Sequence, residues 1–260
     1  MIRCRQFKID PVNNFLTDTR QMTIEVTRQP ASCGALIRGI ELREDLSAAE
    51  VAAVRAAWPK HQVVAFPDQP MEITDIERFA TYMGPNGEDP YIEAIAGHPR
   101  VVQVRREPDE KAPVFAETWH SDWSFLKRPP AATVLYGNII PPTGGDTMFA
   151  DQYAAWEGLP GSMKALLKDR MAVHSARKGY ARDGMYGERD KGRSMAIKYG
   201  DSALKTQSHS IARSHRDRAP CALCQPGLYH RHRRAARRRS HPHPQGTLCA
   251  PGQTGVSISA

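Results

Sequence analysis

The chain of 260 residues has no long apolar run, so the sequence predicts no membrane-spanning helix. Its first twenty residues hold several charged side chains and no apolar segment, which argues against a secretory signal peptide. Cysteine is scarce as well, because only Cys4 and Cys33 precede residue 221. This distribution suits a reducing environment, and we predict a cytoplasmic protein without disulfide bonds.

The net charge of +8 comes almost entirely from the end of the chain. Residues 215–260 contain eight Arg, no Lys and one acid, Asp217, which gives this segment a charge of +7. The first 214 residues are therefore nearly neutral, and nucleic acid is not their expected partner. A nucleic-acid-binding protein acting through its basic tail is one alternative to an enzyme.

Three regions differ in composition. Residues 1–21 show no periodicity and are predicted to be an N-terminal extension, residues 22–215 form the main domain, and residues 216–260 form a basic tail.

Capping boxes at Ser47–Glu50 and Thr74–Glu77 predict two helices, the first ending near Trp58 before Pro59. Further helices are predicted at Gln152–Gly158 and Gly161–Asp169. Strands are predicted at Thr23–Arg28, Gln62–Phe66, Val101–Val104, Ala132–Asn138, Thr147–Ala150, Met171–Ser175 and Ser208–Ser214. Lys178–Arg193 is predicted to be a mobile loop over the site. Many short strands with a few helices predict a mainly β fold, a jelly roll with flanking helices.

The sequence Trp119-His120-Ser121-Asp122 is the most informative motif. In an extended strand, residues two apart point to the same face, so His120 and Asp122 would project side by side. An imidazole and a carboxylate are two of the three ligands of the facial triad that binds Fe(II) in oxygenases. The alternative for such a pair is two exposed polar residues on a strand.

The motifs around this pair resemble the taurine/2,4-dichlorophenoxyacetate dioxygenase family (TauD/TfdA). The similar segments occur in the same order over roughly residues 22–215. They include Ile37-Arg38-Gly39-Ile40, His61–Gln69, Trp119–Phe125, Pro142–Thr147 and Tyr153-Ala154-Ala155-Trp156. The resemblance implies a double-stranded β-helix, with Fe(II) as cofactor and 2-oxoglutarate as cosubstrate. It also implies that the enzyme uses O2 to hydroxylate a small organic acid; a homo-oligomer is compatible with the sequence.

The resemblance assigns roles to individual residues. His120 and Asp122 are the expected metal ligands, and Thr147 is expected to hydrogen-bond a carboxylate of 2-oxoglutarate, although it could be an ordinary strand residue. Trp123 could line the substrate pocket or belong to the core. Sulfonates, sulfate esters and aryloxyalkanoates are the expected substrate class. Taurine itself is not favoured, because the polar side chains that taurine-specific members carry near Asp89 and Ala116 are absent.

The tail has three interpretations. It could be a disordered basic segment or, from Cys221-x-x-Cys224, a zinc site, but the following His spacing fits no zinc-finger pattern. The third interpretation is a reading-frame shift just after His215, since a shifted frame can encode an amphipathic helix of the kind the family carries there. The resemblance then implies that the second iron histidine and the arginine that binds 2-oxoglutarate are missing. The fold would be C-terminally incomplete and the chain could be an inactive remnant, unless His174 or His209 supplies a replacement ligand.

Overall fold

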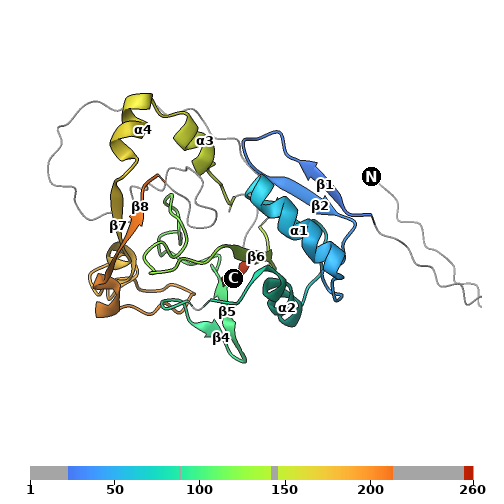
Figure 1. Cartoon of the computed structure of the whole chain (residues 1–260). Helices are drawn as coiled ribbons and strands as arrows, with labels where there is room; N and C mark the ends of the chain where they lie inside the picture. Colours follow the sequence, from blue (N-terminus) through green and yellow to red (C-terminus); the bar gives the residue numbers. More distant parts are fainter. Residues whose placement is uncertain (1–22, 88, 142–145, 213–254, 260) are drawn as a thin grey trace, which may run out of the picture.

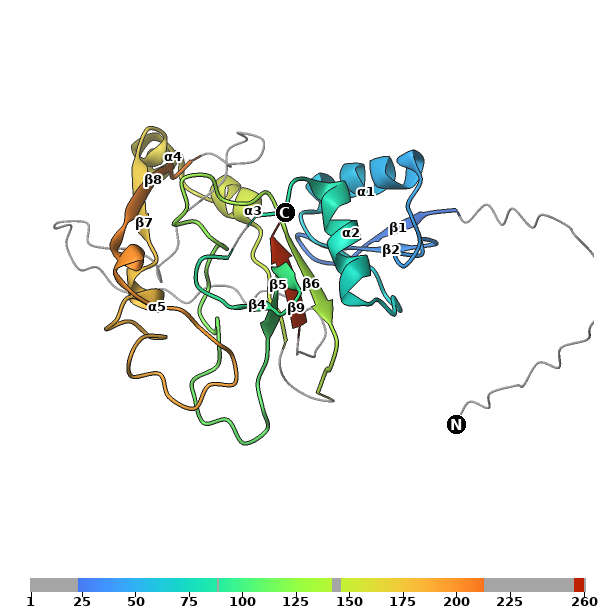
Figure 2. The same ribbon diagram turned by 90° about the horizontal axis from the view of Figure 1, so that it is seen from below.

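The computed structural model describes residues 23–87, 89–141, 146–212 and 255–259. Their elements form three groups, with a four-stranded sheet in the middle and a smaller sheet on either side (Figures 1 and 2). None of the described helices is long and apolar enough to cross a membrane.

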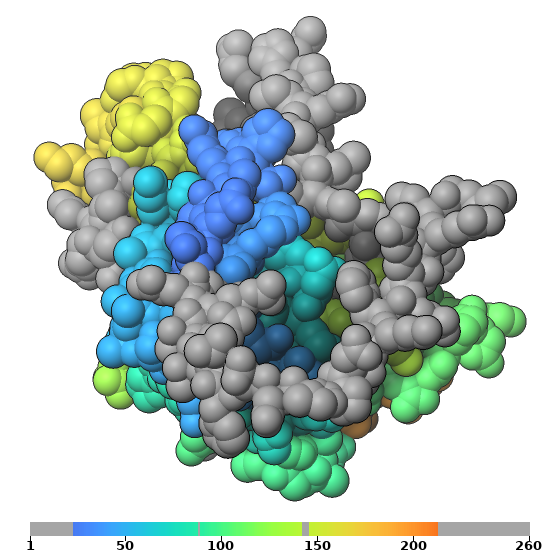
Figure 3. Space-filling model, turned by 90° about the vertical axis from the view of Figure 1, so that its right-hand side faces the viewer, coloured from blue at the N-terminus to red at the C-terminus, as the bar shows by residue number. Residues whose placement is uncertain are grey.

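The first group contains a three-stranded sheet in the order β1-β2-β3, formed by Glu25–Arg28, Ala35–Arg38 and Val64–Ala65. β1 and β2 are antiparallel, while β3 runs parallel to β2. Helices α1, Ala48–His61, and α2, Ile73–Met83, pack against it. Buried side chains from the sheet and both helices form one core, which consists of Ile37, Ile40, Leu42, Val54, Ala57 and Phe79. Figure 3 shows the β1–β2 hairpin in blue on the surface of this group, with α1 in lighter blue beside it.

Helix α1 begins at the predicted capping box. The Ser47 hydroxyl accepts the Glu50 N–H, and the Glu50 carboxylate accepts the Ser47 N–H at 2.7 Å. The predicted end near Trp58 was wrong, because Pro59 lies inside the helix and the Gln62 N–H still bonds to the Trp58 carbonyl oxygen at 2.7 Å. A proline in the last turn removes little backbone bonding, so the helix continues through it.

The N-cap of helix α2 lies two residues before the predicted one. Its N-cap is Glu72, whose N–H donates to the Asp75 carboxylate at 2.9 Å, so the box at Thr74–Glu77 was wrong. A carboxylate at the third helical position serves the same purpose as the expected pair. The buried residues of this helix are Ile76, Phe79 and Ala80.

The central sheet has the order β4-β5-β9-β6 and is antiparallel throughout. Its strands are Ala94–Ile95, His98–Val104, Gly255–Ser259 and Thr133–Gly137 respectively. Helix α2 covers one face, where Ile76, Ala80 and Val101 are buried together. The strands predicted at Val101–Val104 and Ala132–Asn138 are thereby confirmed as parts of β5 and β6.

The third group is built on the antiparallel pair β7, Met171–Ser175, and β8, Thr206–Ser210. β7 has the predicted bounds, and β8 begins two residues before its predicted start. Helices α3, Gln152–Glu157, and α4, Gly161–Leu167, precede β7 and also match prediction, while α5, Arg177–Tyr180, follows it. A 3-10 helix, Asp201–Leu204, leads into β8.

The described strands differ from the expected jelly roll in two ways. The strand predicted at Thr147–Ala150 was wrong, since this segment has no regular structure in the described chain. The described strands form three separate sheets rather than one closed barrel. The tail predicted at residues 216–260 lies outside the described residues except for 255–259, which form β9 in the central sheet. The N-terminal extension, residues 1–21, also lies outside them.

Candidate metal centre

The two predicted ligands, His120 and Asp122, meet in the segment between β5 and β6. Nε2 of His120 lies 3.2 Å from Oδ1 of Asp122. The predicted extended strand was wrong, because residues 122–125 form a turn. The Leu126 N–H donates to the Trp123 carbonyl oxygen at 2.8 Å, and Trp123 takes a left-handed φ of 47°. A turn, not a pleated strand, therefore brings the ring nitrogen and the carboxylate oxygen together.

Each ligand is held by a second hydrogen bond. Nδ1 of His120 donates to the Thr118 carbonyl oxygen at 2.7 Å, and the carbonyl can only accept, so Nδ1 carries a proton. This leaves Nε2 as the coordinating nitrogen. The Thr133 hydroxyl at the start of β6 donates to Oδ2 of Asp122 at 2.7 Å, which leaves Oδ1 facing the imidazole. Such supporting bonds are typical of metal-binding histidines and carboxylates.

The ligand pair also holds opposite charges. The hydrogen bond to Asp122 raises the pKa of His120, and burial opposes this effect only in part. Burial tends to raise the pKa of Asp122, but the hydrogen bonds from His120 and Thr133 outweigh it and lower that pKa. The imidazole therefore holds a proton more strongly, and the carboxylate less strongly, than either group alone, and a metal ion would replace the proton between them.

Asp89 is connected to the ligand turn, a role that sequence reasoning did not predict. Its Oδ2 accepts the Trp123 indole N–H at 3.1 Å, and its Oδ1 accepts the Tyr91 and Ile92 N–H groups at 2.7 and 2.8 Å. Burial raises the pKa of Asp89 against the effect of these donors. Asp followed by Pro90 is a turn signal that could have indicated the backbone bonds, but not the bond to an indole 34 residues away.

Aromatic rings pack beside this turn. Tyr91 stacks on Tyr180 with ring centroids 4.3 Å apart, and Phe125 meets Tyr91 edge to face at 5.5 Å. Burial, followed by the charge of Asp89, raises the pKa of the Tyr180 phenol, which therefore stays protonated at neutral pH. Trp123 is half-buried against Asp89, while Trp119 is exposed.

The segment predicted to be a mobile loop, Lys178–Arg193, is instead anchored. It begins within α5 and ends in a buried ion pair between Arg193 and Asp190. Arg193 also lies 3.8 Å from Glu110, and these three side chains are 2–5% exposed. The sequence suggested a loop because Gly, Arg and Asp are frequent here, but the charged residues pair with each other and with Glu110.

Tyr186 links this anchored segment to the chain that leads to His120. Its hydroxyl oxygen accepts the Ala116 N–H at 3.0 Å, and Ala116 takes a left-handed φ of 57°. The ligand segment is therefore held from outside near both ends, by Tyr186 before His120 and by Asp89 after Asp122.

The candidate replacement ligands His174 and His209 do not join the pair. Both are buried, with rings 5.3 Å apart on neighbouring strands β7 and β8. Nε2 of His209 bonds to the Leu126 carbonyl oxygen at 3.0 Å. Over the described ranges, no group of three His, Cys, Asp or Glu side chains could hold a metal ion. The described centre thus offers two protein ligands.

Several predicted features lie outside this geometry. Thr147 is half-buried and has no regular secondary structure, so its contact with 2-oxoglutarate stays a prediction. Gly144 and Gly145, expected to form the turn before it, lie outside the described residues, as do Cys221 and Cys224.

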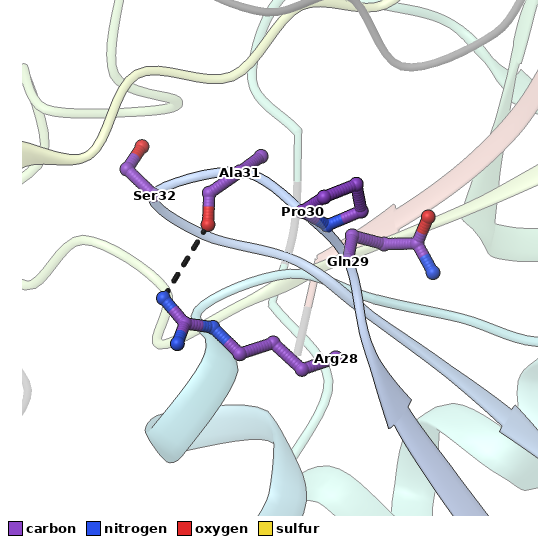
Figure 4. Close-up of a pocket in the computed structure, with 5 residues that line it drawn as sticks. All are labelled: Arg28, Gln29, Pro30, Ala31 and Ser32. Atoms are coloured by element: carbon purple, nitrogen blue, oxygen red, sulfur yellow. Dashed lines mark hydrogen bonds between the residues drawn. The ribbon is translucent and has the colours of Figure 1, made fainter.

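A shallow pocket lies at the β1–β2 hairpin and involves none of these residues. It is lined by Arg28, Gln29, Pro30, Ala31 and Ser32 (Figure 4). The Arg28 guanidinium donates to the Ala31 carbonyl oxygen at 3.5 Å, within the hairpin itself. These five residues supply no metal ligand, so the candidate site remains the turn at His120 and Asp122.

Comparison with known families identifies the family of the chain. The sequence model described as "Taurine catabolism dioxygenase TauD, TfdA family" matches residues 25–248, most of the chain. The chain belongs to the TauD, TfdA family. The family match extends beyond His215, where the recognisable motifs end, into the segment predicted to be a basic tail.

Relatives of this TauD, TfdA chain include enzymes and solved structures. An alpha-ketoglutarate-dependent sulfate ester dioxygenase of Pseudomonas putida is 31% identical over 65% of this chain and 56% of its own length. A (S)-phenoxypropionate/alpha-ketoglutarate-dioxygenase of Delftia acidovorans is 33% identical over 60% of this chain and 56% of its own. A crystal structure of a putative alpha-ketoglutarate-dependent taurine dioxygenase from Burkholderia xenovorans superposes with a TM-score of 0.61 and 26% identity. The superposition covers 79% of this chain and 67% of the Burkholderia xenovorans chain.

These comparisons establish the fold as that of TauD-like dioxygenases. The chain spans about half the length of the curated relatives it matches. The activity and substrate of this chain are therefore proposals that rest on the His120–Asp122 site.

Proposed function

We propose that this TauD, TfdA family chain is built as an Fe(II)- and 2-oxoglutarate-dependent dioxygenase acting on a small organic anion. The observation that carries the proposal is the 3.2 Å approach of His120 Nε2 to Asp122 Oδ1. A nitrogen and an oxygen ligand meet at one point, on the motif that carries the family resemblance.

The residues present fit an Fe(II) ion. Imidazole and carboxylate are the ligand types of non-heme Fe(II) oxygenases. Nδ1 of His120 is already engaged with Thr118 and Oδ2 of Asp122 with Thr133, so the remaining nitrogen and oxygen are directed at the same place. Metal binding needs only the loss of the proton between them.

Iron bound there would hold 2-oxoglutarate and O2 and supply the oxidising chemistry. The chain's own residues supply position and charge. Thr118 and Thr133 orient the two ligands, and we assign Thr147 to a carboxylate of 2-oxoglutarate. The stacked rings of Tyr91 and Tyr180 give the turn an apolar neighbour.

The substrate class follows from the relatives and from Asp89. The names of the related enzymes refer to sulfate esters, phenoxypropionate and 2,4-dichlorophenoxyacetate, all small organic anions. Both oxygens of Asp89 accept N–H groups of the chain, so this position lacks the polar group that taurine-specific members carry near it. We therefore favour a sulfate ester or aryloxyalkanoate over taurine.

A second candidate is an inactive remnant. The described residues hold two ligands, and the family site needs a third together with an arginine for 2-oxoglutarate. In this proposal a reading-frame shift after His215 leaves the fold C-terminally incomplete. Sequencing the gene across the codon for His215 tests the shift directly, and an unbroken frame as printed contradicts it.

Turnover tests the function. The printed chain and a version with the shifted frame restored are incubated with Fe(II), 2-oxoglutarate, O2 and a panel of sulfonates, sulfate esters and aryloxyalkanoates. We expect the restored version to form succinate in step with substrate loss, His120→Ala to form none, and the printed chain to form far less. A restored, folded protein that makes no succinate with any substrate, even uncoupled, contradicts the assignment.

A further inference from the structure

The backbone that carries Asp122 is strained at the next residue. Trp123 has φ of 47°, a left-handed conformation that costs free energy for any residue with a side chain. A large aromatic residue keeps such a conformation only where surrounding contacts fix it. Because Asp122 and Trp123 share a peptide bond, whatever fixes Trp123 also sets the direction of the Asp122 carboxylate.

One side-chain hydrogen bond provides this fixation. The Trp123 indole N–H donates to Oδ2 of Asp89 at 3.1 Å. Hydrogen bonds to a carboxylate are stronger than those between neutral groups, and this one joins residues that are 34 positions apart. Asp89 is therefore a long-range contact that bonds directly to the Trp123 side chain and helps to hold the turn in its left-handed form.

Asp89 is itself rigidly held. Its other oxygen accepts the backbone N–H groups of Tyr91 and Ile92 at 2.7 and 2.8 Å, and both of these residues are buried. Ile92 also forms a β-bridge with Ile197. The carboxylate thus connects the ligand turn to a packed part of the molecule, and each of its oxygens already accepts a hydrogen bond from the chain.

We propose that Asp89 is a positioning residue for the metal ligand Asp122 and that it acts through the indole of Trp123. The inference rests on the proposed function, since it requires Asp122 to be a ligand. It goes further by assigning a role to a carboxylate that touches neither metal nor substrate.

The test is a double-mutant cycle on metal affinity with the full chain. Asp89→Asn keeps one oxygen for the Tyr91 and Ile92 N–H groups but turns an NH2 group toward the indole N–H, so the Trp123 bond is lost. Trp123→Phe removes the same bond from the other side. Co(II) binding is measured by calorimetry and by visible absorption, together with the melting temperature of each variant.

We expect each single substitution to raise the Co(II) dissociation constant on the order of tenfold, as supporting residues of metal sites do. The double variant should bind Co(II) no more weakly than whichever single variant has the lower affinity, because both substitutions remove the same interaction. Asp109→Asn is the matched control, since Asp109 is exposed and should leave the affinity unchanged. If Asp89→Asn fails to fold, Trp123→Phe alone still tests the role.

The results separate this inference from the function on which it rests. If His120→Ala abolishes Co(II) binding but Asp89→Asn and Trp123→Phe lower only the melting temperature, the positioning role is overturned and the metal site stands. If the parent chain binds no Co(II), or His120→Ala leaves binding unchanged, the metal site and the positioning role fall together. Additive losses in the double variant also contradict a role that acts through Trp123.

Discussion

At the scale of single residues, the His120–Asp122 pair binds a proton where it would bind a metal. The pKa of His120 is raised first by its hydrogen bond to Asp122, and that of Asp122 is lowered by His120 and Thr133 despite burial. The raised pKa of His120 stabilises the metal-free fold at pH values below the unfolded histidine pKa of about 6.5, and this contribution is lost as the pH rises through the folded pKa of His120. The lowered pKa of Asp122 stabilises the fold at pH values above the unfolded aspartate pKa of about 4, and this contribution is lost as the pH falls through the folded pKa of Asp122. The metal-free pair is thus most favourable between about pH 4 and 6.5.

The first prediction concerns metal affinity and pH. Below the pKa of His120, Co(II) must displace one proton, so its affinity should rise about tenfold per pH unit and level off above that pKa. Calorimetry in buffers of different ionisation enthalpy measures both the affinity and the proton release. Affinity that is independent of pH between 5 and 7 would count against His120 as a ligand.

The second prediction concerns Thr133, whose hydroxyl donates to Asp122. Thr133→Val keeps the shape and strand preference of the side chain but leaves Oδ2 of Asp122 without this donor. We expect Co(II) affinity to fall about 10-fold or more, with little change in melting temperature. Thr27→Val, on exposed strand β1, is the matched control and should change neither quantity.

The residue scale also shows what sequence could predict here. The ligand pair followed from its motif, and the two side chains do meet. The sequence could not show Asp89 and Tyr186 holding the segment, because both contacts are long-range and join residues of ordinary composition. Predicting an extended strand at His120 failed for a related reason: nothing in the local sequence requires Trp123 to take a left-handed backbone.

At the scale of elements, the sequence predicted a helix or strand correctly where residues close together in the chain determine it. The Ser47 capping box located the start of α1, because a hydroxyl at a helix start acts locally, and the strand predicted at Met171–Ser175 is β7. Thr147–Ala150 has the side chains of a strand but no described partner strand, so its β propensity has no effect. Lys178–Arg193 looked mobile because its buried ion pairs depend on Glu110, far away in sequence.

The third prediction concerns this anchored segment. Arg193→Met leaves the buried carboxylate of Asp190 without the cation that pairs with it, and leaves Glu110 with Arg106 at 3.5 Å. Removing one partner from a buried ion pair costs about 3–5 kcal/mol, so urea denaturation should show a loss of that size. Arg182→Met is the control, because the Arg182 side chain is 62% exposed and its ion pairs contribute only about 0–1 kcal/mol. Equal effects of the two substitutions would contradict the anchoring role.

At the scale of the whole molecule, large apolar side chains are exposed between β6 and β7. The most exposed of them are Ile139 at 69%, Leu166 at 54%, Met148 at 51% and Phe149 at 49%. Such residues in a folded domain are usually covered by another element or by a partner.

The fourth prediction therefore concerns association. We expect the printed chain to form concentration-dependent aggregates or inclusion bodies, because uncovered apolar residues and strand edges promote association. The frame-restored version should be soluble and of uniform mass. Light scattering coupled to size exclusion measures both. A monomeric printed chain that melts cooperatively would count against the incomplete fold.

The most direct test of the account is an anaerobic calorimetric titration of the 260-residue chain with Fe(II), alongside His120→Ala and Asp122→Ala. The described centre has two protein ligands, so we predict one weak site per chain, lost in both variants. His61→Ala, at the end of α1, is the matched control and should bind like the parent. Fe(II) binding that survives His120→Ala and Asp122→Ala unchanged would contradict the metal centre, and the proposed dioxygenase function with it.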